Sequence, residues 1–379
     1  MIFINILNRI DRYNKHQFDI PVEEQLAYMS SLGNPIDDIY RSYFQFKCQW
    51  YFSPFGIKLL WLFLSICAIP FILVFYSYKR NNCVFERKVD SIAEDKGMNE
   101  IIPAELSQKY KISHKEWNSG VSLSFDDIKY ICSHFIGSFH PYFVLKAIIQ
   151  IGAYSDRISR YQPERIITHA EFSFCSSLLT DYCHHRGIKL INVQHGEKLR
   201  YIRDSFFHFD ECYVWDKHYV DMLTEMKAEP TQFRIAVPPS LKIDIEKFRK
   251  ETAYADYKYY LAADNEQEIK SIVDAMAFAK REGKTVRYRI HPRYTDVNIL
   301  KKYVSEDEIE YPKEVSIQES IANLEYAVGS YTTVLLQAHL SGKKVILNDV
   351  TFPKRYLQLK EYGYILAKDD IARLSDKSR

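Results

Sequence analysis

The sequence predicts an α/β protein with two Rossmann-like domains that face a cleft, preceded by a helical region that is partly membrane-associated. Two observations carry this prediction. Short runs rich in β-branched residues alternate with amphipathic runs in two separate stretches, as in parallel sheets with crossover helices. The chain also has 379 residues, of which 47% are hydrophobic. That is enough for two domains that each bury a core.

The first alternating stretch lies in the predicted N-terminal Rossmann-like domain, residues 81–240. Three runs read as strands, and they cover residues 165–170, 189–196 and 211–215. The helical run between the first two, residues 172–187, stops at Gly187, a residue suited to the position after a helix end.

The second alternating stretch follows a charged linker at residues 240–256 and defines a C-terminal Rossmann-like domain, residues 257–379. Its expected strands are 257–263, 285–292, 326–331 and 343–349, and its expected helices are 265–283, 316–324 and 332–342. Two consecutive domains of this kind imply a cleft between them, where nucleotide ligands commonly bind.

The N-terminal region, residues 1–80, contains a charge-free segment from Leu59 to Tyr78. Its length matches the ~20 residues that cross a bilayer. Three interpretations stay open: a buried core helix, a helix in one leaflet, and a membrane span. Pro70 would kink the segment, and aromatic residues such as Trp61 near its ends suit a membrane interface.

Charge and cysteine content exclude several classes of function. The chain has 51 basic and 49 acidic residues, so its net charge of +2 gives no polyanion-binding surface and we expect no nucleic-acid partner. The seven cysteines form no CxxC pair. Neither a disulfide framework nor a zinc site is therefore expected, and the compartment should be reducing.

A basic cluster ends the predicted strand 285–292. It contains Arg289, His291, Pro292 and Arg293. In open α/β sheets ligands bind beyond the carboxyl ends of strands, and an imidazole beside guanidinium groups can clamp a phosphate. Pro292 would end the pairing of this strand. The alternative is a solvated basic strand end without a ligand.

A hydroxyl-rich turn joins a later strand to its helix. Its residues are Gly329, Ser330, Thr332 and Thr333. Glycine permits a tight turn, hydroxyl groups cap the free amides of a helix start, and those amides attract anions. An ordinary helix cap without a ligand is the alternative. Together with the basic cluster, this turn predicts a phosphate-binding site in the C-terminal domain.

Two strand-end turns mark the N-terminal domain, His169–Glu171 and Gln194–Glu197. Consecutive parallel strands are usually neighbours, so the two turns should lie together. We expect Glu171 to act as general base and His195 to be its nearest competitor, because histidine ordinarily titrates near working pH. Glu197 is the third catalytic candidate. For Glu171 the alternative role is helix capping.

These motifs resemble those of a known group of enzymes. His291-Pro292, followed by Ser330, Thr332 and Thr333, resembles the HP and S/T motifs of bacterial sialyltransferases and polysialyltransferases with the GT-B fold. In that group the motifs engage the donor's phosphate and sugar carboxylate. The Gln194–Gly196 turn is also similar to turns in capsule and teichoic-acid transferases. The chain departs from the group in lacking its acidic-acidic-Gly motif, whose place the QHGE turn would take.

The resemblance implies a glycosyltransferase that moves a sugar, for which a sialic acid-like sugar is one candidate, from a nucleotide donor to a surface glycan such as capsule or lipopolysaccharide. A CMP-linked donor is favoured, held by the C-terminal domain, while the N-terminal domain binds the glycan acceptor. The expected location is the cytoplasmic face of the inner membrane, in a peripheral, monotopic or single-span arrangement.

No cofactor or metal is required by this scheme, because the sequence has no persuasive DxD motif. Two alternatives stay open. One is a glycerol- or ribitol-phosphate transferase of cell-wall polymer synthesis. The other is a non-catalytic component of capsule assembly.

Overall fold

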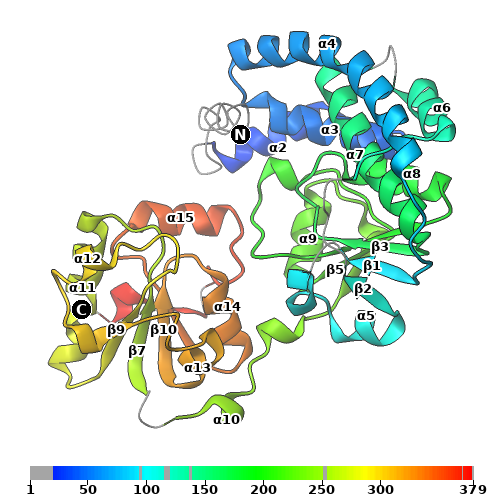
Figure 1. Ribbon diagram of the computed structural model, residues 1–379. Helices are drawn as coiled ribbons and strands as arrows, with labels where there is room; N and C mark the ends of the chain where they lie inside the picture. Colours follow the sequence, from blue (N-terminus) through cyan, green and yellow to red (C-terminus); the bar gives the residue numbers. More distant parts are fainter. Residues whose placement is uncertain are drawn as a thin grey trace. The chain divides into compact units, whose positions relative to one another are not determined.

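The computed structural model describes residues 20–93, 96–114, 120–135, 139–250, 254–368 and 370–377. They form two compact units. The first contains the described residues up to His195 together with Arg200–Ala236, and the second contains Gly196–Leu199 and the described residues from Val237 onward. Each unit has its own six-stranded parallel sheet (Figure 1). The predicted class, α/β with two Rossmann-like domains, is confirmed, whereas the cleft between them stays a prediction.

The first sheet has the strand order β2-β1-β3-β4-β5-β6, and every neighbouring pair is parallel. Its strands are β1 (Ser91–Ala93), β2 (Ile112–His114), β3 (Arg165–Thr168), β4 (Lys189–Val193), β5 (Glu211–Val214) and β6 (Phe233–Ile235). The chain runs outward from β1 to β2 and then returns to β3. The direction of winding therefore reverses between β1 and β3, which is where ligands bind in doubly wound sheets.

The helices of the first unit follow largely from local sequence. They are α2 (Val22–Ser31), α3 (Asp38–Tyr51), α4 (Phe55–Lys79), α5 (Ala104–Lys109), α6 (Phe125–His134), α7 (Pro141–Tyr161), α8 (Ser176–His185) and α9 (Lys217–Glu225). Ser124 begins α6 through a capping box with Asp127. The helix predicted from residue 172 begins only at Ser176, because hydrogen-bonded turns occupy residues 170–176.

Helix α4 packs along α7 and runs in the same direction. Near its start the rings of Trp61 and Tyr142 lie 5.0 Å apart. Near its end Tyr76 lies so close to Gly152 that a Cβ there would be 2.6 Å from the ring. Arg80, just after α4, donates a hydrogen bond to Ser159 near the end of α7.

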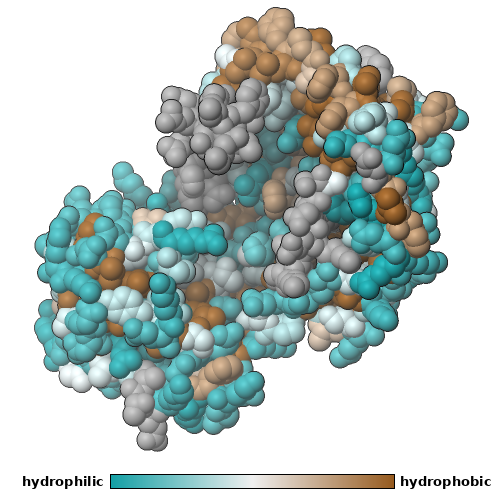
Figure 2. Space-filling model, in the orientation of Figure 1, coloured by the Kyte–Doolittle hydropathy of each residue, from teal (hydrophilic) through white to brown (hydrophobic). Residues whose placement is uncertain are grey.

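The rest of α4 is uncovered. It is long and apolar enough to cross a membrane, and only 6% of its most apolar window is buried. Hydrophobic side chains gather over this helix at the top of Figure 2. A buried core helix would be mostly covered, so that interpretation of Leu59–Tyr78 is wrong.

The second sheet has the strand order β12-β11-β10-β7-β8-β9. Its strands are β7 (Ala255–Tyr260), β8 (Val286–Arg289), β9 (Ile309–Glu310), β10 (Leu324–Gly329), β11 (Lys344–Leu347) and β12 (Ala372–Arg373). The chain winds from β7 to β9 on one side and from β10 to β12 on the other. The reversal therefore lies between β7 and β10.

The helices of the second unit cover both faces of its sheet, with α11 and α14 on opposite sides (Figure 1). They are α10 (Ile245–Phe248), α11 (Glu266–Arg281), α12 (Val297–Leu300), α13 (Ile317–Ala322), α14 (Thr333–Leu340) and α15 (Pro353–Glu361). The apolar face of α11 packs on β7 and β8 through Ile269, Ile272 and Met276. A capping box formed by Asn265 and Glu268 begins α11.

Candidate functional site

The hydroxyl-rich turn lies directly at the winding reversal of the second sheet. Gly329 is the last residue of β10, and Thr332 is the N-cap of α14, where its side chain accepts a hydrogen bond from the Val334 amide at 3.3 Å. Ser330 and Thr333 are half-buried. Gly329 is not among the glycines with positive φ, so this turn does not depend on a left-handed backbone conformation. What this turn offers a ligand is hydroxyl groups and the free amides of a helix start.

The basic cluster lies at the end of the strand on the other side of β7. The Nδ1 atom of His291 accepts a hydrogen bond from the Arg293 amide at 3.1 Å, and its ring stacks on Tyr294 at 4.5 Å. Burial and the Arg293 charge lower the pKa of His291 below its ordinary value. The imidazole is therefore neutral at pH 7, with its proton on Nε2, and can donate that proton to an anion. Pro292 and Arg293 are exposed beside it.

The two turns are neighbours across one strand. The order β10-β7-β8 places β7 between them, and Thr295 links the β8 turn to the end of β7 by donating to the Ala262 carbonyl at 2.9 Å. Neighbouring strands are about 4.8 Å apart, so the ends of β8 and β10, from which the two turns start, are about 10 Å apart. That separation suits a phosphate-containing ligand that contacts both.

Arg289, a predicted donor-binding residue, has a different environment. Its side chain is 8% exposed, and its Nη1 donates to Glu310 at 2.6 Å. The other oxygen of Glu310 accepts from the fully buried Lys258 at 2.7 Å. The ion pair with Glu310 therefore holds Arg289 inside the fold, whereas His291 lies beyond the end of β8. This correction gives Arg289 a structural role beneath the site.

Asp264 is a further candidate residue of the site beside β7, and it was not predicted from the sequence. It follows the end of β7 at the winding reversal, where its carboxylate accepts from the Ala262 amide at 2.7 Å. Burial raises the pKa of Asp264 above its ordinary value. The available signal was its position, immediately after a predicted strand and before the capped start of α11.

In the first unit the two predicted strand-end turns lie side by side. The rings of His169 and His195 are 5.1 Å apart, after β3 and β4. Asn192 on β4 joins the turns. Its Oδ1 accepts from the Ala170 amide at 2.8 Å, and its Nδ2 donates to Glu171 at 3.2 Å. The expected proximity of the turns is confirmed, and Asn192 is the residue that sequence reasoning missed.

The three catalytic candidates differ in exposure. Glu171 is only 2% exposed, whereas His195 is exposed at the end of β4. Glu197 is half-buried and belongs to the Gly196–Leu199 segment, which groups with the second unit. Gly196 has φ +73°, so this turn does require glycine. A base must reach its substrate, so exposure favours His195 over Glu171, the reverse of the sequence expectation.

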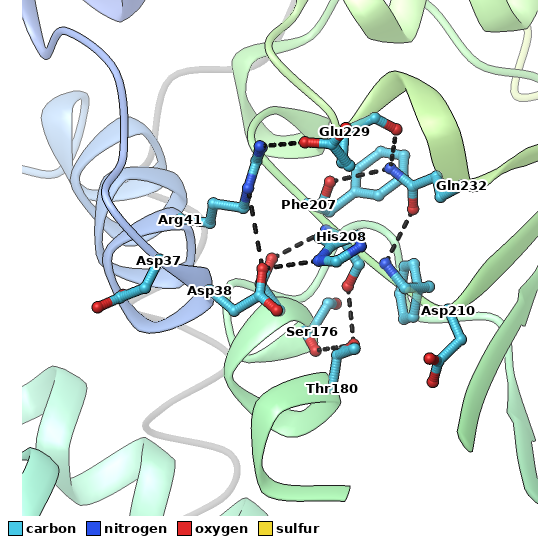
Figure 3. A network of polar contacts seen from close by, with 12 residues as sticks. Asp37, Asp38, Arg41, Ser176, Thr180, Phe207, His208, Asp210, Glu229 and Gln232 are labelled. Carbon is cyan, nitrogen blue, oxygen red and sulfur yellow. Dashed lines mark hydrogen bonds and ion pairs between the residues drawn. The ribbon is translucent and has the colours of Figure 1, made fainter. Parts of the chain in front are cut away.

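Helix α3 extends along the first unit to the end of β3. Figure 3 shows how its start is held: Asp38 faces His208, and Arg41 faces Glu229. The Asp38–His208 contact is 2.7 Å. Further along the helix, Gln45 donates to the Glu171 carbonyl at 2.9 Å. These contacts fix the start and the middle of α3, and the contact in the middle joins the helix to the strand-end turn after β3.

Among the residues that the structure describes, no cluster of three or more His, Cys, Asp or Glu side chains could hold a metal ion. The groups at the strand ends are instead hydroxyls, amides, imidazoles and carboxylates. Two doubly wound parallel sheets, each with such groups at its winding reversal, define a two-domain α/β protein with a candidate anion site in its second unit.

No protein-family model matches the chain, and no curated protein matches it. Several solved structures have a similar fold. UDP-GlcNAc 2-epimerase from Methanocaldococcus jannaschii is 13% identical, with 70% of this chain and 86% of that chain covered and a TM-score of 0.43. A variant of the wall teichoic acid polymerase TagF is 9% identical, with coverage of 81% and 82% and a TM-score of 0.42.

The glycosyltransferase SnogD from Streptomyces nogalater is also similar, at 9% identity, with coverage of 73% and 86% and a TM-score of 0.40. The structural neighbours thus include a nucleotide-sugar epimerase and glycosyltransferases. At these identities the similarity concerns the fold alone.

Proposed function

We propose that this protein is a glycosyltransferase of GT-B type that takes a sugar from a nucleotide donor and works at a membrane surface. The observation that carries the proposal is the pair of turns flanking β7. His291 lies on one side and the Ser330–Thr333 turn on the other, at the winding reversal of the second sheet. This is where doubly wound sheets bind nucleotides.

The proposed chemistry follows from these groups. An acceptor hydroxyl oxygen attacks the anomeric carbon of the donor, and the bond from that carbon to the phosphate oxygen breaks. The nucleotide leaves with the bonding electrons. Nε2–H of His291 and the free amides at the start of α14 stabilise the developing phosphate charge. In the first unit, the exposed His195 takes the proton of the acceptor hydroxyl.

The donor and the glycan are narrower proposals. A CMP-linked, sialic acid-like donor rests on the similarity of the His291-Pro292 and Ser330–Thr333 motifs to those of the bacterial sialyltransferases. A capsule or lipopolysaccharide acceptor rests on the same similarity. A donor with a nucleoside diphosphate fits the pair of turns equally well, because both supply groups for phosphate oxygens.

The membrane location is supported by α4. The helix lies along α7, and Trp61 and Tyr76 contact the same helix near the two ends of α4. A helix docked lengthwise on its own domain cannot cross a bilayer without taking that domain with it. We therefore favour the monotopic arrangement at the cytoplasmic face of the inner membrane, in which the uncovered face of α4 enters one leaflet.

The first test is donor binding by the full chain. CMP-, CDP-, UDP-, GDP- and dTDP-linked sugars are screened by thermal shift, since a ligand at 100 times its Kd adds ~2.7 kcal/mol of stability. His291→Ala should weaken binding of the best donor about 10- to 100-fold through the lost hydrogen bond. The matched control is His339→Ala, at the exposed end of α14, which should bind like wild type.

Equal donor affinity in the two variants would overturn the proposed donor site. The products separate the alternatives. A glycosyltransferase leaves the donor's phosphate on the nucleotide, whereas a glycerol- or ribitol-phosphate transferase carries it into the polymer. A non-catalytic assembly component would form neither product.

A further inference from the structure

A pocket of about 370 Å³ lies in the first unit between the end of α3, the start of α4 and two loops. Its walls include Trp50, Trp61, Tyr142, Phe174, Gln49 and Arg203. Its volume is within the range of small-ligand sites, about 300–1,000 Å³, and it combines aromatic walls with a few polar groups, as such sites do.

The aromatic walls are held by contacts with one another. Tyr142 lies edge-on to Trp50, with ring centroids 4.6 Å apart, and also touches Trp61 at 5.0 Å. Phe174 meets Phe46 of α3 at 5.3 Å. Three of these rings come from different helices, so the pocket depends on the packing of α3, α4 and α7 and not on one flexible loop.

The polar groups complement hydroxyls. Gln49 uses Nε2 for its hydrogen bonds to the Phe172 and Arg203 carbonyls, at 2.8 Å and 3.1 Å, and these bonds do not use its acceptor Oε1. The Nε atom of Arg203 donates a hydrogen bond to Asp204, and this hydrogen bond does not use the Nη groups. Aromatic faces with a nearby acceptor and donor suit a sugar ring, which has apolar C–H faces and a hydroxyl edge.

The position of the pocket indicates how a sugar would arrive. Ile57 and Trp61, from the first turns of α4, form part of its wall. Phe55, Leu59 and Phe63 on the same turns are exposed. The wall is therefore continuous with the apolar surface of the helix. Tryptophan and tyrosine favour the headgroup level of a bilayer, so a ligand in this pocket would lie where lipid headgroups begin.

The loop of Arg203, which lines the pocket, is linked to the strand-end turn after β3. Gln45 of α3 donates to the Glu171 carbonyl at 2.9 Å and to the Arg203 carbonyl at 2.7 Å. One side chain thus fixes both the strand-end turn after β3 and the loop that carries Arg203.

We propose that this pocket binds the sugar headgroup of a membrane glycolipid, the acceptor of the transfer reaction, while the lipid chain lies in the leaflet beside α4. The assignment of the glycolipid as acceptor rests on the proposed function. Binding of the glycolipid to the pocket does not depend on a donor. It predicts that affinity for vesicles rises when their lipids carry sugars.

The test is vesicle co-sedimentation of the full chain without a donor. Vesicles of phosphatidylethanolamine and phosphatidylglycerol are compared with the same vesicles containing a hexosyl-diacylglycerol, a dihexosyl-diacylglycerol or a sugar linked by diphosphate to a polyprenol. Wild type should bind at least one glycolipid vesicle about tenfold more tightly than plain vesicles. Trp61→Leu should lose that gain, measured relative to its own binding to plain vesicles.

The matched control is Phe71→Leu, which also removes an aromatic ring from α4, at an exposed position further along the helix, and which should keep the glycolipid gain. Arg203→Ala, at an exposed side chain, provides a second variant should Trp61→Leu not fold. The proposal is overturned if no glycolipid improves wild-type binding, or if Trp61→Leu and Arg203→Ala both keep the gain. It is also overturned if soluble oligosaccharides compete as well as the glycolipid, because the pocket would then not require a lipid. Donor binding, measured separately, reports on the proposed function alone.

Discussion

The residues at the ends of β3 and β4 illustrate how burial assigns roles that sequence alone leaves open. Glu171 and His195 both follow a strand, and the sequence favoured the carboxylate as base. The structure buries Glu171 beside Asn192 and exposes His195. The difference arises from α3, whose Gln45 covers the Glu171 backbone, and no local pattern could have revealed that contact.

His195→Asn should therefore reduce turnover by about 10²- to 10⁴-fold, the usual contribution of a general base, while donor affinity stays unchanged. Glu171→Gln should reduce turnover much less, because the glutamine can still accept from Asn192. Steady-state kinetics and donor titration on both variants check this. A larger loss in Glu171→Gln than in His195→Asn would restore the carboxylate as the base.

Arg289, in the second unit, likewise has a contact that the local sequence pattern does not reveal. The strand was predicted, although it ends at Arg289 and not at residue 292. The partner that holds Arg289 inward comes from β9, a two-residue strand with too little pattern to predict. Burial alone would raise the pKa of Glu310, yet the nearby Lys258 and Arg289 lower it overall. The ionised Glu310 thus stabilises the fold at neutral pH.

Glu310→Gln should destabilise the protein by about 3–5 kcal/mol at pH 7, because Lys258 would lose its buried partner. A lowered folded pKa gives stability that is present above the ordinary value, about 4.3, and is lost as pH falls through the folded pKa. The difference in the free energy of unfolding between wild type and Glu310→Gln should therefore become smaller in acid. Urea denaturation of wild type and variant at pH 7 and in acid checks this. The control is Glu306→Gln, at an exposed position. A gap that is constant with pH would contradict the role of the ionised carboxylate.

At the scale of elements, prediction succeeded where runs were long and capped. The structure contains the expected strands, which begin at residues 165, 189 and 324, and the expected helix, which begins at Glu266. Gly187 and Gly283 have φ of +70° and +72° after their helices, as expected for those positions. The missed strands are short, since β1, β2 and β6 have three residues each and β9 and β12 have two. Runs of two or three residues show too little alternation to be recognised as strands in a sequence.

Helix α4 leads to a prediction about sidedness. In the monotopic arrangement, residues before and after the helix lie on the same side of the membrane, because both ends of α4 contact the same unit. Ser31→Cys and Lys88→Cys, both at exposed positions, should then be labelled equally by an impermeant maleimide added to sealed vesicles. The free cysteines Cys67 and Cys132 give the internal scale. Cys67 on α4 should be protected, whereas Cys132 on α6 should react.

Labelling of only one of the two introduced cysteines would instead show a membrane span. Reaction of Cys67 at the same rate as Cys132 would show that α4 does not enter the bilayer at all. Protein without vesicles or detergent would give the reference rate of maleimide labelling for Cys67 and Cys132 when neither is protected.

At the scale of the whole molecule, the two doubly wound sheets were predictable because each repeats the same alternation of strands and helices. The two proposed ligands bind to different units. A nucleotide donor is assigned to the turns beside β7 in the second unit, and a lipid-borne sugar to the aromatic pocket of the first. Activity should therefore require both ligands and respond independently to variants of each site.

The most direct test of the central claim is sugar transfer by the full chain on glycolipid vesicles, with each nucleotide sugar labelled in its sugar. For one donor, we predict that label enters the lipid fraction together with an equal amount of free nucleotide. His291→Ala should abolish this transfer and His339→Ala should preserve it. Transfer that is equal in the two variants, or no release of nucleotide from any donor that binds, would contradict the account.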